Sequence, residues 1–190
     1  MCGRYYIEID AKELQDIISE VEKNTKEPYE QLKLKISGEI FPADTVPVQT
    51  GPKEYRFMKW GFIAYNGKPV INARSETALE KPMFKNSMLE RRCLIPASGY
   101  YEWQRNGARK TKYQCFVPNR FMYFAGCWRQ EKNSPLNTFV ILTRPAAASV
   151  EAIHDRMPVI IPQERSGDWL NHNLDVIQEA VTKLMYKQVL

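Results

Sequence analysis

The sequence lacks any long hydrophobic run. No stretch of its 190 residues approaches the roughly 20 consecutive apolar residues that a membrane-spanning helix needs. The opening residues, MCGRYYIEID, also lack the basic and then apolar order of a secretion signal. We therefore expect no membrane partner and a location in the cytoplasm or, in a nucleated cell, the nucleus.

Histidine is scarce, and the spacings that hold metals are missing. The only histidines are His154 and His172, and no two cysteines form a C-x-x-C pair. The four cysteines are Cys2, Cys93, Cys115 and Cys127. Zinc sites normally use such pairs, and a chain of this length without a secretion signal usually keeps its thiols reduced. We predict no metal, no other cofactor and no disulfide.

The residues that are present suffice for a folded core. Hydrophobic residues make up 44% of the chain and aromatic residues 12%, and the length favours one domain, which we expect to cover residues 1–190. The formal net charge is +5 and the pI is about 9.0. This charge suits nucleic-acid binding if the arginines gather on one face, although scattered basic residues would give the same sum.

The first part of the chain predicts a strand and then a helix. Residues 3–9, GRYYIEI, have the pattern of a short strand. Asp10 and Glu13 then form a D-x-x-E start, and apolar residues follow at helical spacing: Leu14, Ile17, Ile18 and Val21. We expect a polar loop around residues 23–29, and no helix in residues 39–52, which three prolines interrupt.

Most of the remaining chain predicts β-structure. Segments rich in aromatic and β-branched residues are 55–65, 69–74, 91–104, 111–118, 121–130, 138–144 and 156–162. Asn106-Gly107 is typical of a hairpin turn. Helical patterns are limited to residues 75–89 and to the tail, 174–185. We predict a single α+β domain built on a curved, mostly antiparallel sheet or open β-barrel with flanking helices.

Cys2 is the first candidate for chemistry. Its small side chain permits excision of Met1, which leaves an amine and a thiol on adjacent carbons. From reference pKa values, an α-amine is roughly 14% neutral near pH 7, against about 0.04% for a lysine. An amine that attacks an aldehyde gives a Schiff base, and the neighbouring thiol can close on the same carbon to form a thiazolidine. The alternative is that Cys2 is a small buried packing residue.

Other candidates stand close to predicted strands. Glu102 lies among aromatic residues in SGYYEWQ, where partial desolvation would help it hold a proton, or it is a solvated glutamate. His154 precedes an apolar strand and suits proton transfer, or it is a surface or capping residue. Asn72 ends a strand, where it could also form a turn, and Arg74 could be solvated.

Four motifs occur together and in order: C-G-R at 2–4, N-A-R-S-E at 72–76, C-L-I-P-A-S-G-Y-Y-E-W at 93–103 and H-D-R-M-P at 154–158. Together they resemble the SRAP (SOS response-associated peptidase) family, whose members shield and process abasic sites in DNA. The resemblance runs from Cys2 to about Trp169. The chain departs from the family pattern in W-G-F-I-A, where Ala64 replaces a common proline.

The resemblance implies a role for each candidate. Cys2, exposed by loss of Met1, would crosslink to the ring-opened aldehyde of an abasic site in single-stranded DNA through a thiazolidine. Asn72 would position the α-amine, Glu102 would act as acid and base in ring opening and reversal, and His154 would assist proton transfer. The family is also credited with removing its own Met1, for which the Cys2 thiol and Glu102 are candidates.

The resemblance also implies a DNA-contacting set. Arginines near the backbone would be Arg4, Arg74 and Arg156, since guanidinium groups suit phosphate. Trp60 and Trp103 offer faces for unstacked bases, unless they pack in the core. Thr143, in the strand TFVILTR, completes the set. We expect a monomer, nucleoid-associated if bacterial, whose partner is single-stranded DNA containing abasic sites.

Two other functions remain open from the residues. In the first, Cys2 is the thiol of an amino-terminal-nucleophile amidohydrolase or peptidase that acts on a small amide, with its own amine as the base. In the second, the chain is a non-catalytic nucleic-acid-binding module and Cys2 is incidental. Dependence of any DNA adduct on both the thiol and a free α-amine separates the crosslinking enzyme from these two.

Overall fold

The computed structural model describes residues 2–8, 15, 19, 33–132 and 134–189. Apart from residues 15 and 19, the helix predicted from Asp10 lies outside these residues, and so does the loop predicted around residues 23–29. Within them the chain forms strands, two short α-helices and two short 3-10 helices. No helix in the described part is long and apolar enough to cross a membrane.

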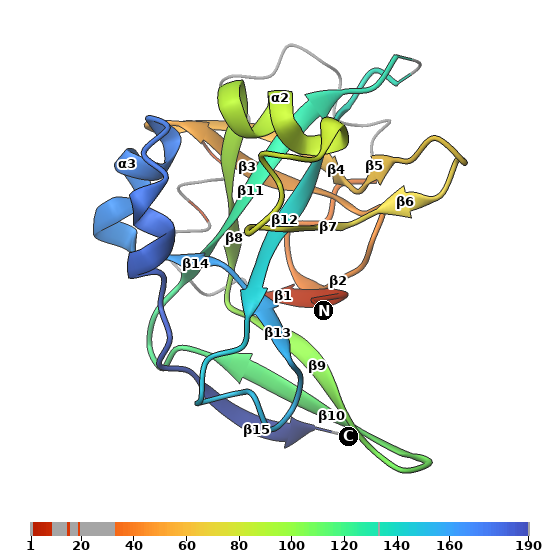
Figure 1. Cartoon of the computed structure of the whole chain (residues 1–190), viewed down its shortest axis with the longest axis vertical. Helices are drawn as coiled ribbons and strands as arrows, with labels where there is room; N and C mark the ends of the chain where they lie inside the picture. The colour runs from red at the N-terminus through yellow and green to blue at the C-terminus, as the bar shows by residue number, and fades with distance from the viewer. Residues whose placement is uncertain (1, 9–14, 16–18, 20–32, 133, 190) are drawn as a thin grey trace.

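A closed β-barrel forms the centre of the molecule (Figure 1). Its strands are β3 (Thr45–Gly51), β4 (Glu54–Trp60), β8 (Arg92–Ala97), β11 (Met122–Gln130) and β12 (Asn137–Pro145). They pair in the order β12-β4-β3-β8-β11, and pairing of β11 with β12 closes the ring. All neighbours are antiparallel except β12 and β4. Closure leaves no free sheet edge around the barrel.

Shorter strands attach to the barrel. They are β7 (Asn72–Arg74) and β13 (Arg156–Pro158), which both pair with β12, and β14 (Ile160–Ile161), which pairs with β11. A small separate hairpin joins β5 (Phe62–Ile63) to β6 (Pro69–Val70). Helix α2 (Pro82–Glu90) lies over one end of the barrel and α3 (Ser166–Leu170) lies at its side (Figure 1).

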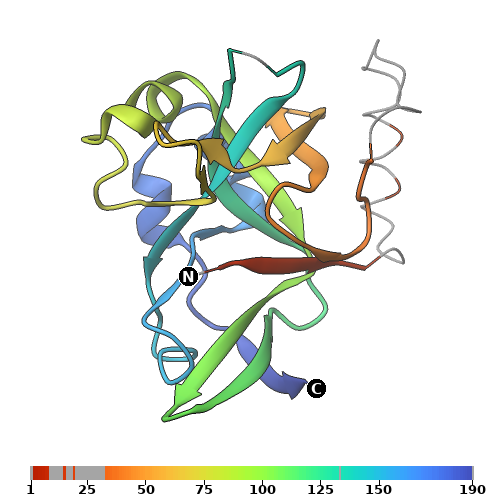
Figure 2. The ribbon, with the colours of Figure 1, turned by 90° about the vertical axis from the view of Figure 1, so that its right-hand side faces the viewer.

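A second sheet carries the amino-terminal strand. Its order is β15 (Met185–Val189), β10 (Arg109–Phe116), β9 (Gly99–Asn106), β1 (Arg4–Ile7) and β2 (Gly38–Ile40), all antiparallel. Strand β1 lies where this sheet meets the barrel, and the β9–β10 hairpin extends away from it (Figure 2). A Cβ at Gly99 would collide with the Tyr6 ring, so glycine is needed for β1 to pair closely with β9.

Aromatic side chains fill the junction between β1 and the barrel. Tyr5 meets Trp60 edge to face, with ring centroids 5.3 Å apart, and Trp60 stacks on Phe139 at 6.4 Å. The Trp60 Nε1–H donates to the Ile71 carbonyl oxygen at 2.9 Å. Packing of this kind fixes the start of the chain against β4 and the segment that leads into β7.

The predicted fold class is confirmed, and each predicted β segment contains strand. The predicted hairpin is present, but its turn lies one residue later than predicted: Asn106 ends β9 and pairs with Arg109, and residues 107 and 108 form the turn, with Gly107 at φ 59°. Of the helix predicted over 75–89, only the second half is helical, as α2. Helix α3 was not predicted.

The helix predicted for the tail is wrong. Residues Asp175–Glu179 form a 3-10 helix, and the chain then extends into β15. The cause is pairing with other strands: the Val181 N–H donates to the Ile160 carbonyl oxygen at 2.9 Å, and β15 pairs with the open edge of β10. The spacing of apolar residues by three or four, from which the helix was predicted, also occurs where an irregular segment packs against the core.

Candidate active site

Asn72 joins the second motif to the start of the chain. Its Nδ2–H donates to the carbonyl oxygen of Cys2 at 2.8 Å, across 70 positions of sequence. Parallel pairing of β7 with β12 sets Asn72 opposite Ile141 and delivers its side chain to this position. The Asn72 Oδ1 atom is buried and accepts no hydrogen bond from the described residues. One acceptor beside Cys2 is therefore available for a further donor.

The Cys2 thiol is enclosed by protein. The residue is 0% exposed, and its Sγ lies 3.8 Å from the Arg4 carbonyl oxygen. Burial, and then the negative charge of Glu102, raise the pKa of the Cys2 thiol well above its usual value. The neutral thiol is thus the stable form at physiological pH. Like Cys2, the other three cysteines are buried free thiols.

Glu102 is placed next to Cys2 by the pairing of β1 with β9. Arg4 lies opposite Tyr101, so the following residue of β9, Glu102, comes beside Gly3 and Cys2. Glu102 is 5% exposed, and its Oε2 accepts a 3.4 Å hydrogen bond from the Trp103 N–H. A carboxylate is therefore held in a largely water-excluded position against the thiol.

His154 faces the same region from the loop before β13. Its Nδ1 accepts a hydrogen bond from the Arg156 backbone N–H at 3.0 Å and lies 2.7 Å from Asp155 Oδ1. A depression of about 440 Å³ brings His154 and Glu102 together. Its walls come from Gly3, Arg4, Glu102, Trp103, Arg105, Lys110, Lys112 and His154. All four predicted catalytic positions thus lie in or directly beside one site.

The rim of this depression is basic and aromatic. Trp103 is partly exposed, with Arg4 at 4.9 Å, Lys110 at 5.1 Å and Lys112 at 5.8 Å from its ring centroid. Glu39 partly balances this charge through ion pairs with Arg4 at 3.2 Å and Lys112 at 3.1 Å. Such a surface suits a phosphate backbone with a base stacked on the tryptophan.

Sequence reasoning missed the basic residues of the β9–β10 hairpin. Arg105, Lys110 and Lys112 line the depression but were not named as candidates. The signal was present as RNGARKTK, a basic run around the predicted Asn106-Gly107 turn. Antiparallel pairing places Arg105 opposite Lys110, which concentrates their charge.

The remaining predicted DNA contacts are divided. Arg74 is exposed at the end of β7, where a phosphate could reach it. Trp60 is 1% exposed, Thr143 is 0% exposed and Arg156 is 8% exposed. The Trp60 ring packs in the core, and Thr143 and Arg156 bond to each other inside the protein. These positions do not support direct DNA contact, and we leave the three residues out of the DNA-contacting surface.

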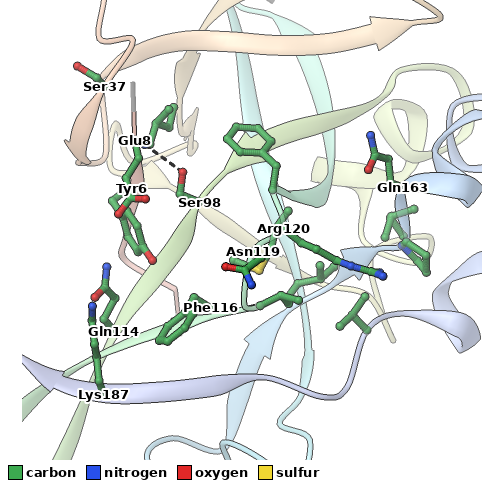
Figure 3. A pocket seen from close by; sticks show the side chains of 18 of the residues that line it. Tyr6, Glu8, Ser37, Ser98, Gln114, Phe116, Asn119, Arg120, Gln163 and Lys187 are labelled. Atoms are coloured by element: carbon green, nitrogen blue, oxygen red, sulfur yellow. Dashed lines mark hydrogen bonds between the residues drawn. The ribbon is translucent and has the colours of Figure 1, made fainter. Parts of the chain in front are cut away.

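A larger hollow lies elsewhere. A groove of about 1710 Å³ between the second sheet and the barrel has none of Cys2, Asn72, Glu102 and His154 in its walls. Figure 3 shows Gln114 and Lys187 on one side and Arg120 and Gln163 on the other. Within the part of the chain that the structure describes, no three metal-ligating side chains cluster here or elsewhere.

Comparisons with known proteins identify relatives of this chain. The chain is similar to the abasic site processing protein YoqW of Bacillus subtilis, with 38% identity over 126 residues that cover 60% of this chain and 56% of the relative. It is also similar to the abasic site processing protein YedK of Escherichia coli, with 29% identity over 120 residues, 60% of this chain and 54% of the relative. The chain thus spans about half the length of the curated relatives it matches.

A solved structure shares the fold. It is a protein from Bacteroides thetaiotaomicron with a TM-score of 0.79 and 23% identity, and the match covers 99% of this chain and 92% of that chain. The sequence model of the family described as SOS response associated peptidase (SRAP) matches residues 1–189. The chain therefore belongs to the SRAP family.

Proposed function

We propose that this protein processes abasic sites in single-stranded DNA by forming a covalent adduct through Cys2 after Met1 has been removed. The main support for the proposal is the 2.8 Å hydrogen bond from Asn72 to the Cys2 carbonyl oxygen. This bond connects the side-chain amide of Asn72 to the residue that carries the reactive amine and thiol. The curated relatives are named as abasic site processing proteins, in agreement with this activity.

The adduct forms in two balanced steps. The Cys2 α-amine adds to the aldehyde carbon of the ring-opened abasic sugar, and loss of one water gives an imine. The Cys2 sulfur then adds to the imine carbon, while its proton moves to the nitrogen. The product is a five-membered thiazolidine, and the net change is the release of one water.

The raised pKa of the Cys2 thiol favours this order of events. A protonated thiol is a weak first nucleophile, whereas a neutral α-amine is available near pH 7. The thiol is needed only to close the ring on an imine that is already within reach. An amidohydrolase would instead need the disfavoured Cys2 thiolate as the first attacking group in every turnover, whereas removal of Met1 needs it only once.

Three side chains assist the reaction in this proposal. Asn72 holds the Cys2 backbone, and its unpaired Oδ1 orients the free amine. Glu102 donates and accepts the proton that opens the sugar ring and later reverses the crosslink. His154, which also lines the depression, assists proton transfer as the amine adds.

Removal of Met1 is an amide hydrolysis in which water is consumed and the Cys2 amine is released. Because the raised pKa keeps the Cys2 thiol protonated, its attack on the Met1 carbonyl carbon needs a base. Glu102 is the carboxylate beside it, and we propose it for this role. The attack moves the methionyl group from the Cys2 nitrogen to the sulfur and frees the amine, and water then hydrolyses the thioester to methionine and the Cys2 thiol. Cys2 and Glu102 would thus act first in the removal of Met1 and then in the formation of the adduct.

The DNA-contacting surface is the basic rim. Arg4, Lys110 and Lys112 surround Trp103, and Arg74 lies exposed at the end of β7. In this proposal phosphates meet these cations and an unstacked base rests on Trp103. We also propose that the protein acts as a monomer in the cytoplasm, with the nucleoid if it is bacterial.

The test mixes untagged protein with a single-stranded oligonucleotide that carries one abasic site and follows the shifted band on a denaturing gel. The unmodified protein should give a durable adduct. Cys2→Ala, prepared with the alanine as its first residue, has an α-amine but no thiol and should give only a Schiff base, visible after trapping with borohydride. Protein acetylated at the amino terminus should give neither species. A durable adduct from acetylated protein would overturn the proposal, and hydrolysis of small amides without any adduct would favour the amidohydrolase.

A further inference from the structure

Arg156 begins β13 with its guanidinium turned into the protein. Both of its terminal nitrogens donate to the Glu76 carboxylate, with Nη2 and Oε2 2.9 Å apart, and Nη2 also donates to the Thr143 carbonyl oxygen at 2.7 Å. Only 9% of the Arg156 side chain is exposed. Three segments therefore meet at one guanidinium: the turn after β7, strand β12 and strand β13.

The backbone of the same residue holds His154. The Arg156 N–H donates to His154 Nδ1 at 3.0 Å, so in the neutral imidazole this contact places the proton on Nε2. Asp155 Oδ1, 2.7 Å from the same Nδ1, favours the proton on Nδ1 instead. The Arg156 N–H and the Asp155 carboxylate thus compete for one nitrogen.

The strand ladder alone anchors Arg156 weakly. Arg156 pairs with Pro145 at the last position of the β12–β13 register, and Pro145 has no N–H to donate. One further backbone bond, from Ala146 N–H to the Asp155 carbonyl oxygen at 2.9 Å, lies beyond it. Side-chain pairing with Glu76 supplies the anchorage that the ladder lacks.

We propose that Glu76 is a positioning residue, which holds the Arg156 guanidinium and thereby fixes the Arg156 N–H against His154 Nδ1. A two-point carboxylate–guanidinium pair is well suited to this, because it fixes orientation as well as position. The effect on catalysis rests on the proposed function, whereas the imidazole geometry exists without DNA.

The first experiment asks whether Glu76 acts through His154. Glu76→Gln should lower the rate of adduct formation about tenfold, a part of what proton-transfer groups contribute. In a His154→Ala background the same substitution should change the rate less than about twofold, because the residue it positions is gone. Glu80→Gln, an exposed glutamate of the same turn region, is the matched control and should change neither rate. An equal loss in both backgrounds would overturn the proposal.

The second experiment needs no DNA. Nitrogen NMR of the imidazoles at pH 8 should show His154 with its proton on Nε2, and Glu76→Gln should shift it toward Nδ1 as Asp155 gains the contact. His172 serves as an internal reference and should not change. An unchanged His154 tautomer would refute the positioning role. Absence of any adduct from unmodified protein, with the tautomer shift present, would instead refute the proposed function alone.

Discussion

The side-chain amide of Asn72 donates to the carbonyl oxygen of Cys2 at 2.8 Å, and the other polar atom of that amide is buried without a donor from the described residues. An unpaired buried acceptor is unfavourable by about 1–3 kcal/mol. A free α-amine on Cys2 would supply the missing donor. The contact between Asn72 and Cys2 and the nearby Glu102 therefore both have consequences that substitution can measure.

Asn72→Ala should lower the rate of adduct formation by about tenfold or more, since one positioning hydrogen bond is worth on the order of 1–2 kcal/mol. Initial rates on abasic single-stranded DNA, quenched under denaturing conditions, measure the effect. Asn86→Ala, at an exposed position on α2, is the matched control. Equal rates for the Asn72 and Asn86 variants would remove Asn72 from the mechanism.

Glu102→Gln should change both the rate of adduct formation and the pKa of the Cys2 thiol. In protein prepared with Cys2 as its first residue, adduct formation should slow by about 10²-fold, because the proton donor and acceptor is lost. The pKa of the Cys2 thiol should fall, because the Glu102 charge is one cause of its elevation. Alkylation rates of Cys2 against pH, read by peptide mass spectrometry, measure this second effect. If the Cys2 alkylation profile stays where it was, the electrostatic coupling between the two groups is wrong.

The basic rim predicts opposite changes in DNA affinity for two substitutions. Trp103→Ala should weaken binding to undamaged single-stranded DNA by about 1–3 kcal/mol, the usual value of one stacked base. Glu39→Gln should strengthen binding and steepen its salt dependence, since Glu39 pairs with Arg4 and Lys112. Fluorescence anisotropy at several salt concentrations measures both. Weaker binding by Glu39→Gln would show that DNA does not use this rim.

The ion pair of Glu76 with Arg156 predicts pH-dependent stability. Pairing with Arg156 lowers the pKa of Glu76 from 4.5 to about 2 in the folded protein. A depressed carboxyl pKa stabilises the folded state above pH 4.5, and this contribution is lost as the pH falls toward 2. Glu76→Gln should therefore reduce stability near pH 7 by about 1 kcal/mol, a figure kept small because the Glu76 side chain is partly solvated.

Urea unfolding of the unmodified and Glu76→Gln proteins at several pH values tests this prediction. The difference between their unfolding free energies should shrink steadily below pH 4.5. A constant difference down to pH 3 would mean that the Glu76 charge contributes nothing to stability.

Local sequence signals predicted much of the β-structure, but they did not predict that the carboxy-terminal segment pairs with β10 as strand β15. Alternating aromatic and β-branched residues located most strands, and Asn106-Gly107 indicated the hairpin, because these signals act within a few residues. Strands β2, β3 and β15 were not predicted; the prolines of residues 39–52 obscured the barrel strand β3. The form of the tail depends on the free edge of β10, which is formed by residues about 70 positions earlier. A helical spacing around Ile177 could not reveal that competing partner.

The candidate site shows the same division. The motifs located Cys2, Asn72, Glu102 and His154, and the structure brings these residues to one region. The identity of a residue as arginine or tryptophan does not reveal whether its side chain faces water. Arg156 is turned inward by Glu76, and Trp60 is covered by Tyr5 and Phe139. Burial depends on the whole fold, so these positions needed the structure.

Peptide mapping of the purified adduct shows directly whether the abasic sugar is attached to Cys2 after loss of Met1. Untagged protein is reacted with an abasic single-stranded oligonucleotide, digested with a protease and a nuclease, and analysed by tandem mass spectrometry. The account predicts that the sugar remnant lies on the amino-terminal peptide that begins with Cys2, with a mass equal to the two parts minus one water. A remnant on a lysine, or on a peptide that still carries Met1, would contradict it.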